Sequence, residues 1–78
     1  MEYITDRKRH LICLPYSIDN LHKMAKELGI NRKWFEVSKL GHAHYDIPKR
    51  RIKEIEAKCR IVSPKDIVRI IKGYITEI

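Results

Sequence analysis

The sequence predicts a small α+β domain in which a three-stranded sheet is covered by two to three helices, in the order β-β-α-(turn)-α-β-α. Two short β-branched and aromatic segments open the chain, segments with helical periodicity follow, and one further apolar segment precedes the last helix. With 78 residues, the chain is expected to form a single domain over residues 1–78. A domain of this size hides only about 60–65% of the surface that its unfolded chain exposes.

The chain opens with two predicted strands and one predicted helix. The segments Glu2–Thr5 and His10–Leu14 are rich in β-branched and aromatic residues, and the polar residues between them indicate a hairpin. A helix is expected at Ile18–Leu28, where apolar residues recur at helical spacing. Ser17 suits its N-cap and Gly29 suits the position just after its end, because these residue types satisfy the free backbone groups of helix termini.

The middle of the chain is expected to be less regular. Asn31 can cap a short turn over residues 32–35. Residues 37–47 show no helical period, and Gly41 permits a sharp bend among them. The sequence therefore predicts an irregular loop here, between two helical segments.

Two more helices and a third strand complete the predicted domain. Pro48 suits a first helical position, and this helix is expected to run to about Lys58. A short apolar segment at residues 60–62 predicts the third strand. Ser63 followed by a proline is a strong helix start, and Gly73 is expected to end the last helix.

The composition indicates a basic protein with an anionic partner. The chain has 17 Lys and Arg against 10 Asp and Glu, a net charge of +7, which attracts nucleic acid, nucleotides or an acidic membrane surface. The competing interpretation is that the basic residues only solvate the surface. Cys13 and Cys59 are too few for the disulfide framework of a small secreted protein, and no segment resembles a membrane span or a signal peptide. We therefore expect a cytoplasmic protein with no membrane partner.

One motif suggests zinc. Residues 42–46 read His-Ala-His-Tyr-Asp, and alternating histidines with an aspartate open the zinc motif of the metallo-β-lactamase fold. In an extended segment the two histidines and Asp46 point to one side and Tyr45 to the other. Against zinc, Ile47 stands where that motif has another histidine, His10 and His22 show no ligand-like spacing, and the chain is far too short for that fold. We therefore predict no metal and no cofactor.

A second interpretation assigns acid–base chemistry to His44 and Asp46, because a carboxylate beside an imidazole can fix its tautomer and raise its pKa. The protein would then be a small hydrolase or nuclease. No serine or cysteine stands nearby as an obvious nucleophile. Asp46 can instead cap the following helix, and we favour that structural role.

Binding of a phosphate-bearing ligand, either nucleic acid or a nucleotide, fits the sequence best. The loop leads into a helix that begins with Lys49 and Arg50, and a helix N-terminus offers free N–H groups and a partial positive charge. His44 and Tyr45 can add neutral donors. Trp34 can stack on a base, although in so small a domain the largest aromatic residues usually fill the core. The third alternative is a protein-interaction module that docks an acidic partner.

Most of the chain resembles an uncharacterised family of small phage and bacterial proteins, a domain of unknown function named DUF4031. The resemblance rests on the order of four motifs. They are Leu-His-x-Met-Ala-x-x-Leu-Gly at residues 21–29, Arg-Lys-Trp-Phe at residues 32–35, His44-Tyr45-Asp46 and Lys49-Arg50. The chain departs from the family pattern at Pro48, where members often have a polar cap, and at Cys59, near where they tend to have small residues.

The resemblance implies that His44, Tyr45 and Asp46 form the site, with His22 and Trp34 as neighbours. It suggests a bacterial or phage-infected cytoplasm and implies no activity. His42 lies outside the family pattern, which further weakens the zinc interpretation.

The sequence thus predicts a non-enzymatic binding module for a phosphate-bearing ligand. A phage accessory or anti-defence protein that binds a nucleotide signal of its host is a special case. The candidate ligand-binding residues are His22, Arg32, Trp34, His44, Tyr45, Asp46, Lys49 and Arg50. The tail at residues 74–78 is too apolar to be a free end, and Ile75 and Ile78 lie off the buried face of the last predicted helix. We therefore hypothesise a homodimer or higher homo-oligomer that covers them.

Overall fold

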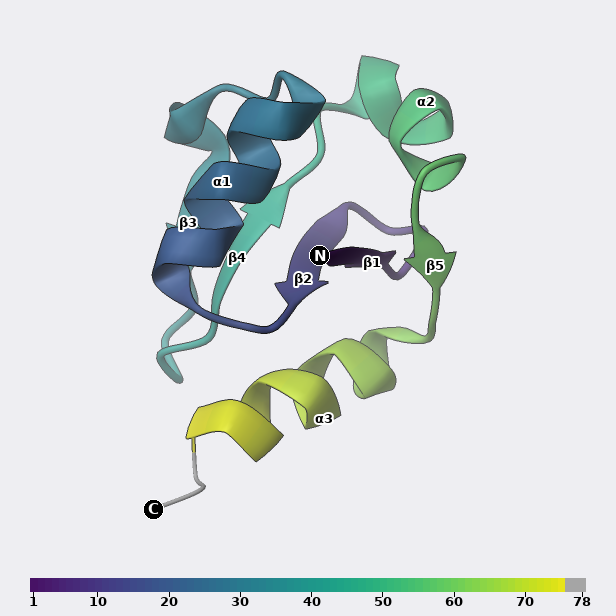
Figure 1. Cartoon of the computed structure of the whole chain (residues 1–78). Coiled ribbons are helices and arrows are strands. Elements are labelled where there is room, and N and C mark those ends of the chain that lie inside the picture. The colour runs from purple at the N-terminus through teal and green to yellow at the C-terminus, as the bar shows by residue number, and fades with distance from the viewer. Residues whose placement is uncertain (76–78) are drawn as a thin grey trace.

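The computed structural model describes the backbone of residues 1–75 and the side chains of residues 1–74. Its strands are β1 (Glu2–Thr5), β2 (His10–Leu14), β3 (Phe35–Val37), β4 (Ala43–Asp46) and β5 (Arg60–Ile61) (Figure 1). Its helices are α1 (Ile18–Leu28), α2 (Ile52–Glu56) and α3 (Pro64–Ile75), with 3-10 turns η1 (Arg32–Trp34) and η2 (Lys49–Arg51). The predicted α+β class is confirmed.

The sheet has five strands in the order β3-β4-β2-β1-β5, so the prediction of three strands is wrong. Of the two missed strands, β4 lies within the segment predicted as a loop, whereas β3 begins at the end of the predicted turn and reaches only the first residue of that loop. They form a short hairpin that turns at Gly41, whose φ of 81° is open to glycine at no steric cost. The strands are too short to show a clear period, and β4 becomes a strand because it pairs with β2 as well as with β3.

The first and last helices begin as predicted. The hydroxyl of Ser17 accepts a hydrogen bond from the Asn20 N–H at 3.0 Å, and Gly29 adopts a left-handed conformation after α1. The hydroxyl of Ser63 accepts one from the Asp66 N–H at 3.2 Å. The helix α3, however, continues through Gly73 to Ile75, which corrects the predicted stop. A glycine ends a helix by adopting positive φ, and Gly73 does not do so.

The helix predicted from Pro48 to Lys58 is shorter and broken. A 3-10 turn over Lys49–Arg51 precedes α2, which has 5 residues. The break lies at Arg51, whose φ of −109° and ψ of 3° leave the helical region. The segment that we predicted as a phosphate-binding helix N-terminus is therefore a single 3-10 turn, which is too short to act as one.

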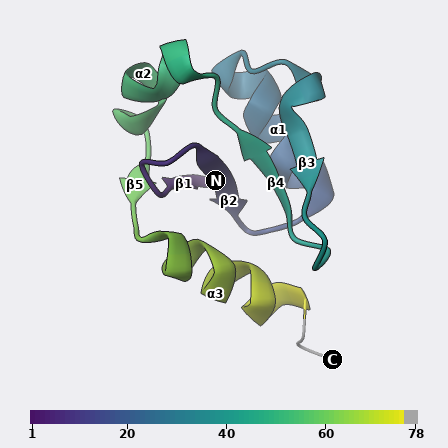
Figure 2. The same cartoon turned by 180° about the vertical axis from the view of Figure 1, so that it is seen from behind.

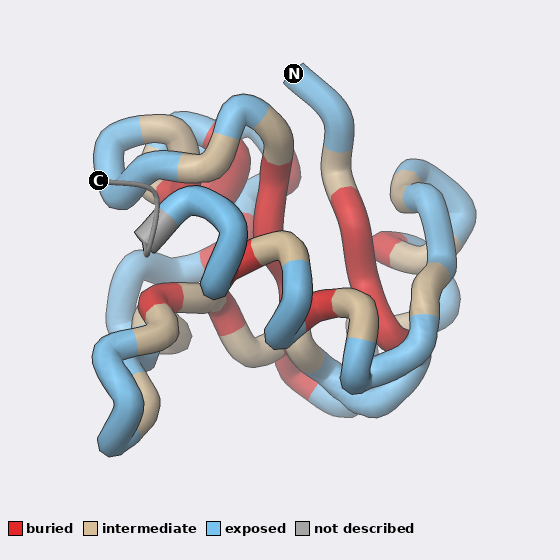
Figure 3. Tube along the Cα trace, turned by 90° about the horizontal axis from the view of Figure 1, so that it is seen from below, coloured by how far each residue is buried: buried red, intermediate tan, exposed pale blue. Residues whose placement is uncertain are grey.

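The two faces of the sheet differ in what covers them (Figure 1, Figure 2). Residues directly opposite each other in an antiparallel pair share a face. Leu11 lies opposite Tyr45 and faces α1, whereas His10 lies opposite Asp46 on the other face, beside α3. The buried residues run through the middle of the molecule (Figure 3). The core consists of Ile4, Leu11, Ile12, Cys13, Leu21, Met24, Ala25, Leu28, Ile30, Ala43, Tyr45, Ile47, Ile55, Ile67 and Ile71.

The oligomer hypothesis rests on the apolar residues of the C-terminal segment. The ring of Tyr74 lies 5.8 Å from the ring of Tyr16, between centroids, so this part of α3 contacts its own domain. The side chain of Ile75 and all of Ile78 lie outside the described residues, and the oligomer stays a prediction. Among the described residues, no helix has the length and apolar character needed to cross a membrane.

Candidate functional site

The His-Tyr-Asp motif lies on β4 and is divided between the two faces of the sheet. Because side chains alternate along a strand, His44 and Asp46 point toward the side of α3, and Tyr45 points toward α1. The alternation predicted for an extended segment is confirmed, although the segment is a paired strand. The predicted site residues therefore do not converge on one place, and each face has its own group of side chains.

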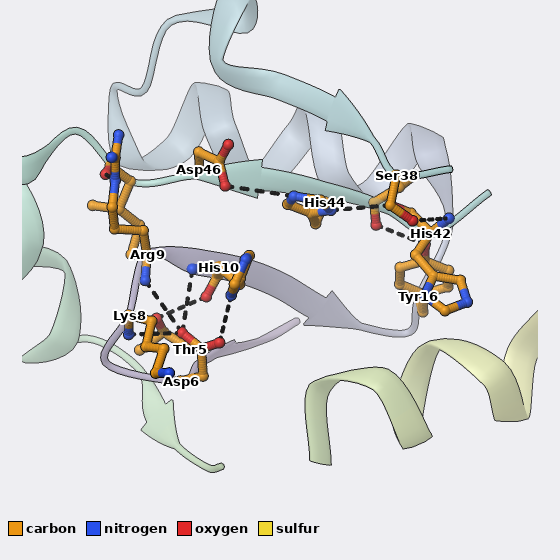
Figure 4. A network of polar contacts seen from close by, with 12 residues as sticks. Thr5, Asp6, Lys8, Arg9, His10, Tyr16, Ser38, His42, His44 and Asp46 are labelled. Carbon is orange, nitrogen blue, oxygen red and sulfur yellow. Dashed lines mark hydrogen bonds and ion pairs between the residues drawn. The ribbon is translucent and has the colours of Figure 1, made fainter. Parts of the chain in front are cut away.

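On the α3 face, His44 is held from both sides. Its Nδ1 lies 3.0 Å from the backbone carbonyl of His42, and its Nε2 lies 3.4 Å from Oδ1 of Asp46 (Figure 4). A carbonyl can only accept a hydrogen bond, so Nδ1 of His44 carries a proton. The side chains of His44 and Asp46 are 11% and 25% exposed, which leaves the pair partly screened from water.

His10 completes this group from the neighbouring strand β2. Its ring lies edge-on to the ring of His44, with 5.3 Å between centroids. Its Nδ1 lies 2.5 Å from Oδ2 of Asp6, whose side chain has no exposed surface. In Figure 4 the His10 ring stands between Asp6 and β4.

Asp6 also holds the turn between β1 and β2. Its Oδ1 accepts hydrogen bonds from the backbone N–H groups of Lys8, Arg9 and His10, at 2.8, 3.2 and 3.3 Å. Burial by itself would raise the pKa of Asp6, but the hydrogen bonds from His10 and from the backbone of Lys8 and Arg9 outweigh it and lower this pKa. Asp6 is therefore an ionised carboxylate, and Nδ1 of His10 carries the proton between them.

A further carboxylate borders the group. Glu36 on β3 lies directly opposite His44 and shares its face. A hydrogen bond with Asp46, and then repulsion between the two carboxylates, raise the pKa of Glu36. Two carboxylates and two imidazoles thus meet on the ends of three adjacent strands.

Sequence reasoning missed both His10 and Glu36. Their distances along the chain from His44 form no recognisable ligand spacing. The signal is cross-strand pairing, which places His10 opposite Asp46 and Glu36 opposite His44. One ligand atom each from His10, His44 and Asp46 lie within 4.8 Å of one another, a grouping able to hold a metal ion. The lack of a ligand-like spacing for His10 in the sequence therefore does not exclude a metal.

A small cavity of about 180 Å³ adjoins this group, between the sheet and α3. Its polar side is formed by His10, His42, His44 and Ser38, and its other side by residues of α3. The α3 residues are Pro64, Ile67, Val68 and Ile71. The cavity therefore has imidazoles on one wall and aliphatic groups on the other.

The α1 face has a larger and more open cavity of about 590 Å³. It is lined by Asp19, His22, Lys23, Ala25, Lys26, Ile30, Arg32 and Tyr45. At its base, Nδ1 of His22 lies 2.6 Å from the hydroxyl of Tyr45, and the ring of His22 packs 4.7 Å from that of Phe35, between centroids. Burial raises the pKa of Tyr45, so its hydroxyl stays protonated at neutral pH.

Comparison with known proteins agrees with the motif resemblance. The chain matches the family described as "Protein of unknown function (DUF4031)" over residues 5–73. It belongs to the DUF4031 family. No curated protein and no solved structure matches the chain.

In this DUF4031 protein the remaining predicted residues lie apart from the two groups. Trp34 is half-buried and packs against the core, and Nζ of Lys33 lies 5.6 Å from its ring centroid. Lys49 and Arg50 are exposed in η2 and are not among the residues that line either cavity. Of the eight predicted residues, three line the cavity beside α1, namely His22, Arg32 and Tyr45.

Proposed function

We propose that the protein binds a phosphate-bearing ligand, a nucleotide or a short stretch of nucleic acid, in the cavity beside α1. The observation that supports this is the charge of the lining. Lys23, Lys26 and Arg32 stand around the cavity with Asp19 as the one acidic lining residue. The net charge of +7 adds a field of the same sign over the whole surface.

The shape and the neutral groups of the cavity suit such a ligand. Its volume of about 590 Å³ falls within the range of small-molecule sites, roughly 300–1,000 Å³. The guanidinium of Arg32 can form paired hydrogen bonds with phosphate oxygens, and the lysines add point charges. His22, fixed by Tyr45, can donate or accept a further hydrogen bond at the base. Lys49 and Arg50 would contribute through long-range attraction.

The proposal extends to the bacterial or phage-infected cytoplasm that the family resemblance suggests. A nucleotide signal of the host is a ligand of the class described, and an anti-defence role would follow from its capture. The cellular setting adds no contact to the cavity beside α1.

The test measures binding of a fluorescent nucleotide and of a short fluorescent oligonucleotide by anisotropy. Affinity should fall steeply between about 50 and 200 mM salt, since each phosphate contact releases counterions. The variant Lys26→Ala with Arg32→Ala should weaken binding by about tenfold or more, equivalent to about 1.4 kcal/mol. The matched control is Lys53→Ala with Lys65→Ala, which removes the same charge from exposed positions elsewhere.

Three outcomes are informative. Loss of binding in the cavity variant alone supports the proposal. Equal weakening in both variants means that diffuse charge, and no cavity, holds the ligand. No binding at low salt, together with capture of polyglutamate, would favour the alternative of a module that docks an acidic protein.

A second candidate function is hydrolysis of a phosphate ester through His44 and Asp46. The observation that favours it is the distance of 3.4 Å between Nε2 of His44 and Oδ1 of Asp46. An imidazole so placed can exchange a proton with an attacking water. Turnover of a phosphodiester by the wild type, absent in His44→Ala, would support hydrolysis, and absence of turnover in the wild type would reject it.

A further inference from the structure

We propose that His10, His44 and Asp46 bind a divalent transition-metal ion of the zinc class on the α3 face of the sheet. This site is distinct from the basic cavity beside α1. The proposal therefore holds or fails independently of phosphate binding. It rests on the tautomers of the two histidines, the spacing of the ligand atoms, and the support behind each ligand.

Both imidazoles have Nδ1 occupied by an acceptor. Nδ1 of His44 donates to the His42 carbonyl, and Nδ1 of His10 donates to Asp6. In a neutral imidazole whose Nδ1 carries the proton, Nε2 has a free lone pair and can accept a hydrogen bond or bind a metal. Nε2 of His44 faces a carboxylate oxygen of Asp46, which is also an acceptor. Two facing acceptors are stable only with a proton or a cation between them.

The spacing suits a metal ion. Two ligands at about 2.0–2.2 Å from zinc and at the tetrahedral angle lie about 3.4 Å apart. The separation between Nε2 of His44 and Oδ1 of Asp46 is 3.4 Å. One ligand atom of His10 lies within 4.8 Å of the ligand atoms of both other residues, so the three residues form a group that could hold one ion.

Each ligand is supported in the way that metal sites require. Metal-binding histidines almost always donate their second N–H to a carboxylate or a backbone carbonyl, which fixes the ring and raises its basicity. Here Asp6 does this for His10 and the His42 carbonyl does it for His44. The ligands lie on the paired strands β2 and β4, where His10 is directly opposite Asp46. Strands hold ligands more precisely than loops do.

The surroundings add charge and an open position. Glu36 lies beside Asp46. A divalent cation between or near two adjacent carboxylates would reduce the repulsion between their negative charges. The cavity of about 180 Å³ adjoins His10 and His44, so a fourth ligand, water or a small molecule, has room to approach. Two imidazoles with carboxylate suit zinc, iron(II) or manganese better than magnesium or calcium, which prefer all-oxygen sites.

The test is metal binding by tag-free protein that has been dialysed against a chelator. Calorimetric titration with Zn²⁺ should give one ion per chain, and Mg²⁺ should give no comparable heat. Co²⁺ should give the visible absorption of a site with nitrogen and oxygen ligands. His44→Ala and Asp46→Asn should each weaken Zn²⁺ binding by at least the roughly 10-fold to 100-fold that is typical when a metal site loses a residue that only supports a ligand, because both remove a ligand.

The matched control is His22→Ala, which removes a histidine of the same protein from the opposite face and should leave Zn²⁺ affinity unchanged. Circular dichroism checks the fold of each variant. Because His10→Ala can unfold the hairpin, Glu36→Gln provides a milder change that should weaken binding without that risk. No stoichiometric Zn²⁺ binding by the wild type would overturn the proposal. Equal affinity in His44→Ala and wild type, or a sulfur-to-cobalt charge-transfer band that disappears in Cys59→Ser, would overturn it as well.

Discussion

Oδ2 of Asp6 lies 2.5 Å from Nδ1 of His10, so a buried carboxylate fixes an imidazole that stands on the next strand. The same carboxylate accepts hydrogen bonds from the backbone N–H groups of the turn between β1 and β2. The orientation of His10 on the α3 face therefore depends on the closing of this hairpin. One side chain links the stability of the turn to the geometry of the histidine group.

The first prediction concerns the acid limb of stability. The pKa of Asp6 is lowered in the folded state, so its contribution is complete above the unfolded-state pKa of about 3.9 and is lost as the pH falls through the lower folded-state pKa. Asp6→Asn should lower the free energy of unfolding at pH 7 by about 1–3 kcal/mol, because Asn has no charge and places an NH₂ donor where Oδ2 accepts from Nδ1 of His10. Urea denaturation between pH 2 and pH 7 should show this difference shrinking at acid pH. The control Asp66→Asn, at a side chain that is 47% exposed, should change the free energy of unfolding little. A stability difference between Asp6→Asn and the wild type that stays constant with pH would contradict the explanation.

The second prediction separates the two arginines that follow Lys49. Arg51 donates from Nη1 to the Gly29 carbonyl at 2.6 Å and from Nη2 to the Leu28 carbonyl at 2.8 Å, and it also pairs with Glu54. Arg51→Ala should destabilise the domain by about 1–3 kcal/mol, because the end of α1 loses its partner. The neighbouring Arg50→Ala should stay within about 0.5 kcal/mol of the wild type. Equal thermal melting of the two variants would show that the Arg51 contacts contribute nothing.

The third prediction concerns the thiols. Burial, followed by the charge of Glu27, raises the pKa of Cys13 to about 11, and burial with the charge of Glu56 raises that of Cys59 to about 11. Only thiolates react readily, and at pH 8 about one thiol in a thousand would be ionised. Both should react with iodoacetamide far more slowly in the folded protein than in guanidinium chloride. The rate for Cys59 should rise as the pH approaches 11. Rapid labelling of either residue at pH 7 would contradict these pKa values.

The fourth prediction concerns assembly. If Ile75 and Ile78 are covered by a second copy, light scattering at micromolar concentration should give at least twice the mass of one chain. Replacing both with serine should shift the protein to the monomer, since each buried isoleucine contributes about 1.5–3 kcal/mol. The replacement Val68→Ser, at an exposed position of α3, is the control. A monomeric mass for the wild type would reject the oligomer.

Much of the fold follows from local sequence signals. The hairpin of β1 and β2, the capped helix α1 and the start of α3 each depend on residues close to one another in the chain. The hydroxyls of Ser17 and Ser63 each accept a hydrogen bond from the N–H three residues later, and a serine just before a helical segment is enough to indicate such a cap. The alternation of His44, Tyr45 and Asp46 was predictable for the same reason, because it requires only an extended backbone.

The site depended on tertiary structure. The hairpin of β3 and β4 is stabilised because β4 also pairs with β2. Nothing in the sequence of residues 37–47 predicts that pairing. The same pairing places His10 opposite Asp46, although they are 36 positions apart along the chain. The sequence by itself thus determined the family, the class of fold and the histidines and carboxylates available. Which of them meet was decided by strand register, because register sets both the face and the opposite neighbour of every side chain in a sheet.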